Sequence, residues 1–184
     1  MLQDHNPASV PLPSSGRGNR PLGMAAGTLV RTERGEWPVE SLAPGDLVLT
    51  RHEGLQPLRA IGVTMARDIA VIRLGPGALG RPRGAAELVV PIAQQIMLRD
   101  WRARDLYGAD AAPTPAAALA GEPHIHRETL PALRVFQLHF DRPQVIWANG
   151  LELTSTRIAM PSPRRQPGPD AKRRAHTRIR QEPR

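Results

Sequence analysis

The chain has 184 residues, a formal net charge of +8 and no cysteine. It therefore cannot form disulfides, thiolate metal sites or a cysteine nucleophile. Its length suits one domain with tails, and no stretch reaches the roughly 18 apolar residues that a membrane span needs. The first residues also lack the pattern of a Sec signal peptide, so we expect a protein outside the bilayer, cytoplasmic by default.

Composition divides the chain into three parts. Residues 1–22 are rich in Pro, Ser, Gly and Asn without an apolar period, so we expect a disordered lead. Residues 161–184 carry eight basic and two acidic side chains and no apolar face, so we expect a disordered basic tail. The segment between them, residues 23–160, should form the folded domain.

Short apolar runs separated by Gly and Pro turns indicate strands throughout the folded segment. Residues 115–120 are alanine-rich and give the only predicted helical turn. In chain order, the predicted strands are 27–32, 37–40, 47–51, 56–63, 69–74, 87–90, 134–140 and 144–147. This spacing favours an all-β domain of short antiparallel strands.

The run GTLVRTERGEWPVESLAPGDLVLTRHEGLQPLRAIG, residues 27–62, resembles the opening of the Hint domain, the hedgehog/intein autoprocessing fold, in its bacterial branch. Later pieces agree in order, at 75–80, 88–90, 106–109, 140–142 and 148–152, with 106–109 interpreted as a loop. The similarity spans about residues 23–156. It implies a disc of short, curved antiparallel strands and, in intact members, protein splicing or autocleavage.

The resemblance also implies which positions carry the chemistry. The family's nucleophile stands four residues before the Gly-Thr pair, where this chain has Gly23. The histidine that protonates the scissile amide is replaced by Gln94, and an amide does not transfer protons near neutral pH. Gln137 and Pro143 also stand where the branch usually has histidine. We therefore expect a degenerate, catalytically inactive site in which Gly23, Thr28 and Gln94 still lie together.

Three other patterns suggest different chemistry. Glu122, His124, His126 and Glu128 would share one face of a strand and could hold zinc, although Pro123 interrupts the run, so we expect no metal and no cofactor. His139 and Asp141 with Thr154 or Ser155 could be written as a hydrolase triad, but no nucleophile elbow is present. We expect Asp141 to cap the hairpin turn instead. Residues 75–80 match G-x-G-x-x-G without a following helix, which argues against a dinucleotide site.

The alternative function is binding. Clustered arginines in residues 161–184 would attract polyanions weakly and without sequence preference, and the partners of the domain itself are unknown. The sequence also predicts a core, composed of Leu29, Val39, Leu42, Val48, Ile61, Ile72, Val89, Ile96, Phe136, Phe140 and Ile146.

Overall fold

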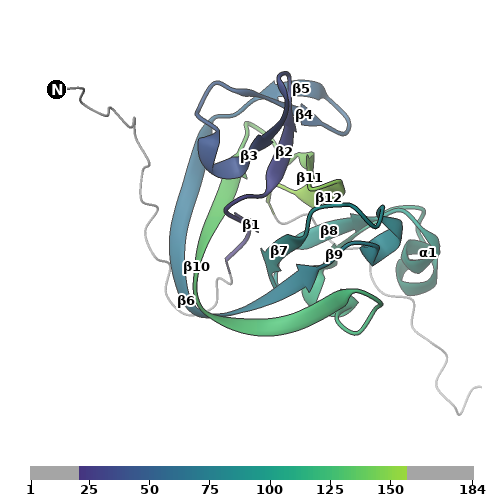
Figure 1. Ribbon diagram of the computed structural model, residues 1–184. Coiled ribbons are helices and arrows are strands. Elements are labelled where there is room, and N and C mark those ends of the chain that lie inside the picture. Colours follow the sequence, from purple (N-terminus) through teal and green to yellow (C-terminus); the bar gives the residue numbers. More distant parts are fainter. Residues whose placement is uncertain (1–20, 157–184) are drawn as a thin grey trace, which may run out of the picture.

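The computed structural model describes residues 21–156. The predicted tails, residues 1–22 and 161–184, lie outside the described residues except for 21 and 22. Strands are the main regular structure of the described part (Figure 1). Its strands are β1 (Met24–Ala25), β2 (Leu29–Thr32), β3 (Gly35–Pro38), β4 (Leu47–Thr50), β5 (Gly54–Pro57), β6 (Ala60–Leu74), β7 (Leu88–Pro91), β8 (Gln95–Leu98), β9 (Ala112–Pro115), β10 (Ile125–His139), β11 (Val145–Ala148) and β12 (Leu151–Thr154). The all-β prediction is confirmed.

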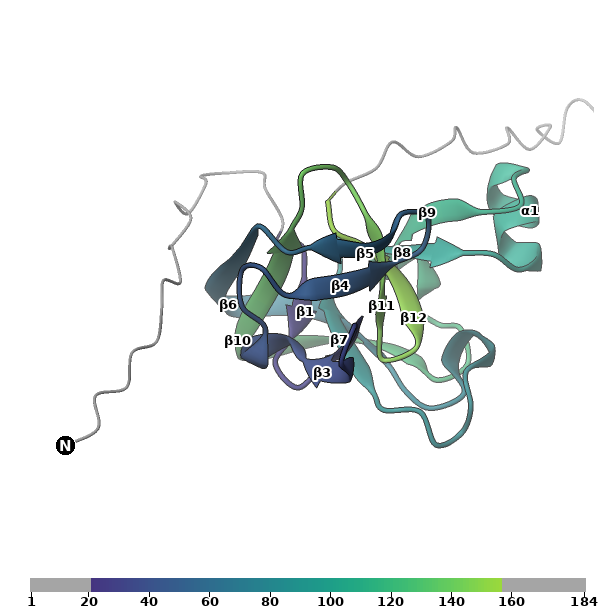
Figure 2. The same ribbon diagram turned by 90° about the horizontal axis from the view of Figure 1, so that it is seen from above.

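The strands form two antiparallel sheets. One has the order β1-β10-β6-β7, and the other runs β3-β2-β4-β11-β12-β8-β9, with β5 added on β4. Strands β6 and β10 are long and curved and pair along almost their whole length, so they frame one side of the molecule (Figures 1 and 2). The first and last strands of the described chain thus belong to different sheets of one structure.

The bend in the β6–β10 pair has a local cause. Ile69 pairs with Leu130 and Arg67 with Ala132, which leaves Asp68 opposite Pro131. Asp68 has a φ of 45°, and proline has no N–H to donate to the ladder. Both strands therefore lose regular pairing at the same point, and the sheet can turn there.

Helical structure is scarce in the described residues, and its placement corrects the sequence analysis. The predicted turn at 115–120 is the 3-10 turn η3 (Ala116–Leu119), and two others are η1 (Val39–Ser41) and η2 (Ala78–Gly80). An α-helix, α1 (Trp101–Tyr107), was not predicted, and its end was interpreted as a loop. Asp100 caps its first turn by accepting from the Arg102 N–H, and Gly108 ends it with a φ of 69°. These capping residues were the available signal.

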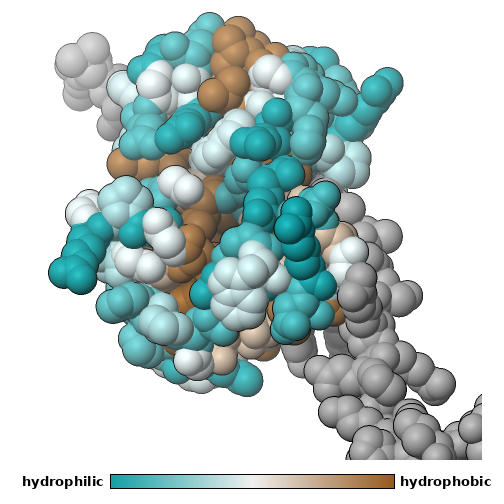
Figure 3. Space-filling view, turned by 90° about the vertical axis from the view of Figure 1, so that its right-hand side faces the viewer, coloured by the Kyte–Doolittle hydropathy of each residue, from teal (hydrophilic) through white to brown (hydrophobic). Residues whose placement is uncertain are grey.

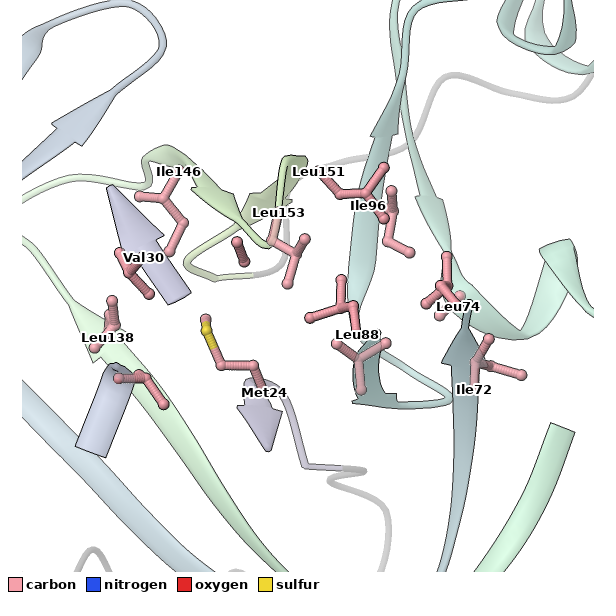
Figure 4. Close-up of a cluster of buried hydrophobic side chains, with 14 of the residues drawn as sticks. Met24, Val30, Ile72, Leu74, Leu88, Ile96, Leu138, Ile146, Leu151 and Leu153 are labelled. Atoms are coloured by element: carbon pink, nitrogen blue, oxygen red, sulfur yellow. The ribbon is translucent and has the colours of Figure 1, made fainter. Parts of the chain in front are cut away.

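The main core lies between the two sheets (Figure 4). Seven predicted core residues are buried: Val39, Leu42, Val48, Ile72, Ile96, Phe136 and Ile146. Four others are only half-buried, namely Leu29, Ile61, Val89 and Phe140. On β2 the inward positions are Val30 and Thr32, so the face assigned to Leu29 was wrong by one residue. The other three pack against the margins of the two apolar clusters.

No helix among residues 21–156 is long and apolar enough to cross a membrane. The face seen in Figure 3 is covered mostly by hydrophilic side chains, between which a hydrophobic strip is visible.

Candidate functional site

Gln94 lies in the turn between β7 and β8, and its side chain is almost completely buried, with 1% exposure. Its backbone is fixed from both sides. The Gln94 N–H donates to the Pro91 carbonyl at 2.9 Å, and the Gln94 carbonyl accepts from the Ala116 N–H at 2.8 Å. These two bonds fix the backbone from which the Gln94 side chain extends.

The Gln94 amide group joins the two ends of the described chain. Its Oε1 accepts from the Gly23 N–H at 2.8 Å, and its Nε2 donates to the Thr154 carbonyl and to the Gln95 carbonyl, each at 2.9 Å. One planar amide therefore satisfies one backbone donor and two backbone acceptors. We call the group formed by Gly23, Gln94 and Thr154 the Gln94 clasp.

Gly23 is buried directly before β1, and its conformation leaves no room for a side chain. Its φ is 125°, a region that residues with a Cβ rarely adopt. A Cβ built on Gly23 would lie 2.8 Å from the carbonyl carbon of Phe136 and still closer to the carbonyl oxygen of the same residue. The obstacle is backbone of β10, which pairs with β1 at this register, so it cannot rotate away. In this arrangement, position 23 accepts only glycine.

Thr28 takes part in a different interaction from the one predicted. Its hydroxyl donates to the Ala25 carbonyl at 2.7 Å and closes the turn between β1 and β2, and its side chain is buried. The structure thus brings Gly23 and Gln94 into direct contact and uses Thr28 within the adjacent turn.

Thr154, the last residue of β12, belongs to the clasp, and Ser155 follows it; neither was singled out as a member of this site. The Ser155 Oγ accepts from the Gln144 N–H at 3.0 Å, and the Gln137 Nε2 reaches the Ser155 carbonyl at 3.5 Å. Sequence reasoning had no signal for Thr154, because it contributes its backbone carbonyl, which every residue possesses.

The arrangement suggested for a metal is not present. His124 has a φ of 64° and precedes β10, so Glu122 and His124 do not continue the strand face of His126. Glu122 accepts from Arg102, and Glu128 pairs with Arg73. Among residues 21–156, no group of three or more His, Asp and Glu side chains is placed to hold an ion.

The residues of the possible hydrolase triad are not joined to one another by hydrogen bonds within the described structure. Both carboxylate oxygens of Asp141 accept from Arg59, with the shortest contact at 2.7 Å, and these hydrogen bonds hold the pKa of Asp141 below its usual value. The expected side-chain cap of the turn is therefore wrong, because the carboxylate reaches across to Arg59. The His139 Nε2 is buried and has no hydrogen-bond partner within the described structure, and burial lowers the pKa of His139.

Chemically, the Gln94 clasp is a neutral network. It holds two amide nitrogens and three carbonyl oxygens by hydrogen bonds, and the amide of Gln94 neither accepts nor releases a proton near neutral pH. Its hydrogen bonds can fix the backbone at residue 23 and at residue 154.

Comparison with known proteins identifies the fold. The family model described as "Hint domain" matches residues 22–159. The chain belongs to the Hint domain family. Its fold is similar to the solution structure of a bacterial intein-like domain from Clostridium thermocellum, with 14% identity, a TM-score of 0.51 and coverage of 71% of this chain and 96% of that chain.

Two inteins are also similar to this Hint domain. The MchDnaB-1 intein gives 15% identity and a TM-score of 0.47, covering 71% of this chain and 98% of that chain. The gp41-1 intein gives 12% identity and a TM-score of 0.45, covering 71% and 96%. No curated protein matches the chain at significant similarity.

Proposed function

We propose that this protein keeps the Hint scaffold, which belongs to a family of self-processing domains, without its cleavage chemistry. The observation that carries the proposal is the backbone of Gly23. Its φ of 125° and the Phe136 carbonyl beside it leave no space for any nucleophilic side chain at the position where the family resemblance expects one.

The state of Gln94 supports the same conclusion. A catalytic acid must be free to give its proton to the scissile amide, whereas both polar ends of Gln94 are occupied by backbone groups. The side-chain groups of Gln94 that would position a reacting amide are therefore already bonded to the folded backbone. The role that follows is structural: Gln94 fixes the segments that enter and leave the domain next to each other.

Intact-mass spectrometry of the full chain tests the proposal. After long incubation with dithiothreitol or hydroxylamine, the protein should remain a single species of 20.1 kDa, because no ester or thioester forms. Cleavage beside residue 23, or a hydroxamate adduct anywhere in the chain, would show that another group performs the reaction.

A reconstruction experiment sharpens the test. We expect the double variant Gly23→Cys, Gln94→His to stay uncleaved as well, because the new Cβ collides with β10 before the sulfur can be placed. Circular dichroism of the double variant, beside the single variant Gln94→His, separates loss of folding from loss of chemistry, because it reports whether the sheet survives the change at residue 23. Efficient thiol-dependent cleavage of the double variant would contradict the steric argument.

The alternative function is polyanion binding through residues 161–184, a segment that contains eight basic and two acidic residues. This segment lies outside the described residues, so the alternative rests on charge alone. Its test concerns the whole molecule and is given in the Discussion.

A further inference from the structure

The turn between β11 and β12 consists of two residues, Asn149 and Gly150, across which Ala148 pairs with Leu151. Both turn residues have a positive φ, at 45° and 79°, a combination that Asn-Gly pairs favour in short hairpins. Of the three asparagines in the chain, only Asn149 is followed by glycine. An Asn-Gly pair is also prone to lose ammonia, because glycine has no Cβ to hinder attack by its backbone nitrogen on the asparagine side chain.

The side chain of Asn149 is anchored on two distant segments and is buried, with 7% exposure. Its Oδ1 accepts from the Leu29 N–H at 2.7 Å, and its Nδ2 donates to the Glu87 carbonyl at 2.6 Å. The Asn149 N–H also donates to the Leu29 carbonyl at 2.9 Å. One residue thus joins the turn to β2 and to the segment before β7, and the turn cannot move away from them without breaking all three bonds.

Loss of ammonia at Asn149 requires a different side-chain position. The Gly150 nitrogen must attack the Asn149 Cγ, so that a new C–N bond forms, the Gly150 nitrogen gives up its proton, and Nδ2 leaves as ammonia. Water then opens the resulting cyclic imide to aspartate or isoaspartate. In the folded domain both polar atoms of the side chain are held on Leu29 and Glu87, so the attack has to wait until the hairpin opens.

The products do not fit the folded hairpin. Aspartate at position 149 offers no donor to the Glu87 carbonyl and places a carboxylate in a buried position against it. Isoaspartate, in addition, lengthens the backbone of the turn by a methylene group, which shifts β12 against β11. Strand β12 carries Leu153 into the core (Figure 4) and brings the Thr154 carbonyl to Gln94. A change in the turn therefore disturbs both the core and the Gln94 clasp.

We infer that Asn149 is a deamidation site that the folded hairpin protects. The amide stays intact while its bonds to Leu29 and Glu87 are made, and an opened chain converts it to aspartate or isoaspartate. The converted chain does not re-form the native hairpin, so unfolding of this domain becomes irreversible with time. The inference goes beyond the proposed function, because it concerns the chemistry of the β11–β12 turn and not cleavage beside Gly23.

Peptide mapping by mass spectrometry of the full chain measures the conversion of Asn149. The protein is kept in mildly alkaline buffer, with and without guanidinium chloride above the unfolding midpoint. We expect conversion to be at least about tenfold faster in the denaturant, which corresponds to a free energy of opening of about 1.4 kcal/mol or more. Gly150→Ala should slow it in the denaturant, where no fold is needed. Equal rates with and without denaturant, or an unchanged rate in the Gly150 variant, would overturn the inference.

Refolding tests whether the product is excluded from the fold. Chains aged in denaturant are diluted into buffer, and size-exclusion chromatography separates folded from unfolded protein. Converted chains should collect in the unfolded fraction, and equal proportions in both fractions would contradict the inference.

The variant Asn149→Asp reproduces the aspartate product. It should have a lower melting temperature than the parent or fail to fold, as circular dichroism reports. Gln56→Glu is the matched control, because it makes the same exchange of amide for carboxylate at an exposed hydrogen bond, and it should change the melting temperature little. An Asn149 variant as stable as the Gln56 variant would show that the fold accepts the product and would refute the inference.

Discussion

At the scale of single residues, the Hint domain depends on Gly23, which is restricted both by its positive φ and by the backbone beside it. A comparison with Gly27 separates these two effects. Gly23 and Gly27 both have positive φ, at 125° and 80°, but a Cβ would meet the Phe136 carbonyl only at Gly23 and nothing within 4 Å at Gly27. We expect Gly27→Ala to lower the free energy of unfolding by about 1 kcal/mol. Gly23→Ala should lower it by about 3 kcal/mol or more, because steric overlap is added.

Urea denaturation of the two glycine variants beside the parent protein measures the difference. Equal losses would show that β10 moves aside at little cost, and the steric argument for an inactive site would then fail.

The Gln94 clasp gives a second prediction. Gln94→Ala leaves the Gly23 N–H and two carbonyls without partners in a buried place, so we expect a loss of about 2–3 kcal/mol in the free energy of unfolding. Gln56→Ala is the matched control, because the Gln56 Nε2 makes one exposed hydrogen bond, to the Glu53 carbonyl at 2.8 Å. Thermal and chemical unfolding should both show a larger loss of stability for Gln94→Ala than for Gln56→Ala. A Gln94 variant as stable as the Gln56 variant would refute the stabilising role of the Gln94 clasp.

His139 makes stability depend on pH. Burial lowers its pKa in the folded protein, so the unfolded chain binds a proton at a higher pH than the folded one does. Its neutral form is fully compatible with folding above the unfolded pKa of about 6.5, and stability is lost as the pH falls from there through the folded pKa. Unfolding curves between about pH 7.5 and 5 should therefore show a smaller acid loss for His139→Gln.

The comparison variant for this pH test is His126→Gln, at an exposed position on the same strand. It should keep the acid loss of the parent protein, and an undiminished acid loss in the His139 variant would assign the effect elsewhere.

At the scale of elements, the bend of β6 and β10 depends on the pair Asp68 and Pro131. Asp68 adopts a φ of 45°, which short polar residues and glycine tolerate and β-branched residues do not. We expect Asp68→Val to lower the free energy of unfolding by about 1–2 kcal/mol and Asp68→Gly to stay within about 1 kcal/mol of the parent. Differential scanning calorimetry measures both, and a tolerated valine would show that the backbone can straighten there.

The errors of the sequence analysis concern the boundaries and the number of the strands. Residues 56–63 and 69–74 were predicted as separate strands, whereas they contain the end of β5 and most of the continuous β6. The gap between the two predicted strands covers residues 64–68, where mostly exposed positions in the middle of a long strand show no apolar alternation. Strands β8, β9 and β12 were missed: their buried and half-buried positions do not alternate, and two of the four residues of β9 are prolines.

At the scale of the whole molecule, charge is unevenly distributed along the chain. Residues 161–184 hold a net charge of +6, out of the total of +8. If these residues bind polyanions, their deletion should abolish retardation of duplex DNA in a gel-shift assay and leave the melting temperature nearly unchanged. Binding by the full chain should fall by orders of magnitude between about 50 and 200 mM salt.

The same assay distinguishes the two functions. Retained DNA binding by the truncated chain, or affinity that is insensitive to salt, would place binding in the domain and refute a role for the tail.

The sequence by itself determined the fold class and the family, because turn chemistry and the run at 27–62 are local patterns. Gly23 and Gln94 are 71 positions apart, and only the tertiary structure decided that they share a hydrogen bond. It alone also showed the Phe136 carbonyl beside Gly23 and the two backbone groups that hold the side chain of Asn149. Backbone groups carry no sequence signature, and the partners of a buried side chain depend on which distant segments pack around it, so neither could be predicted from the order of residues.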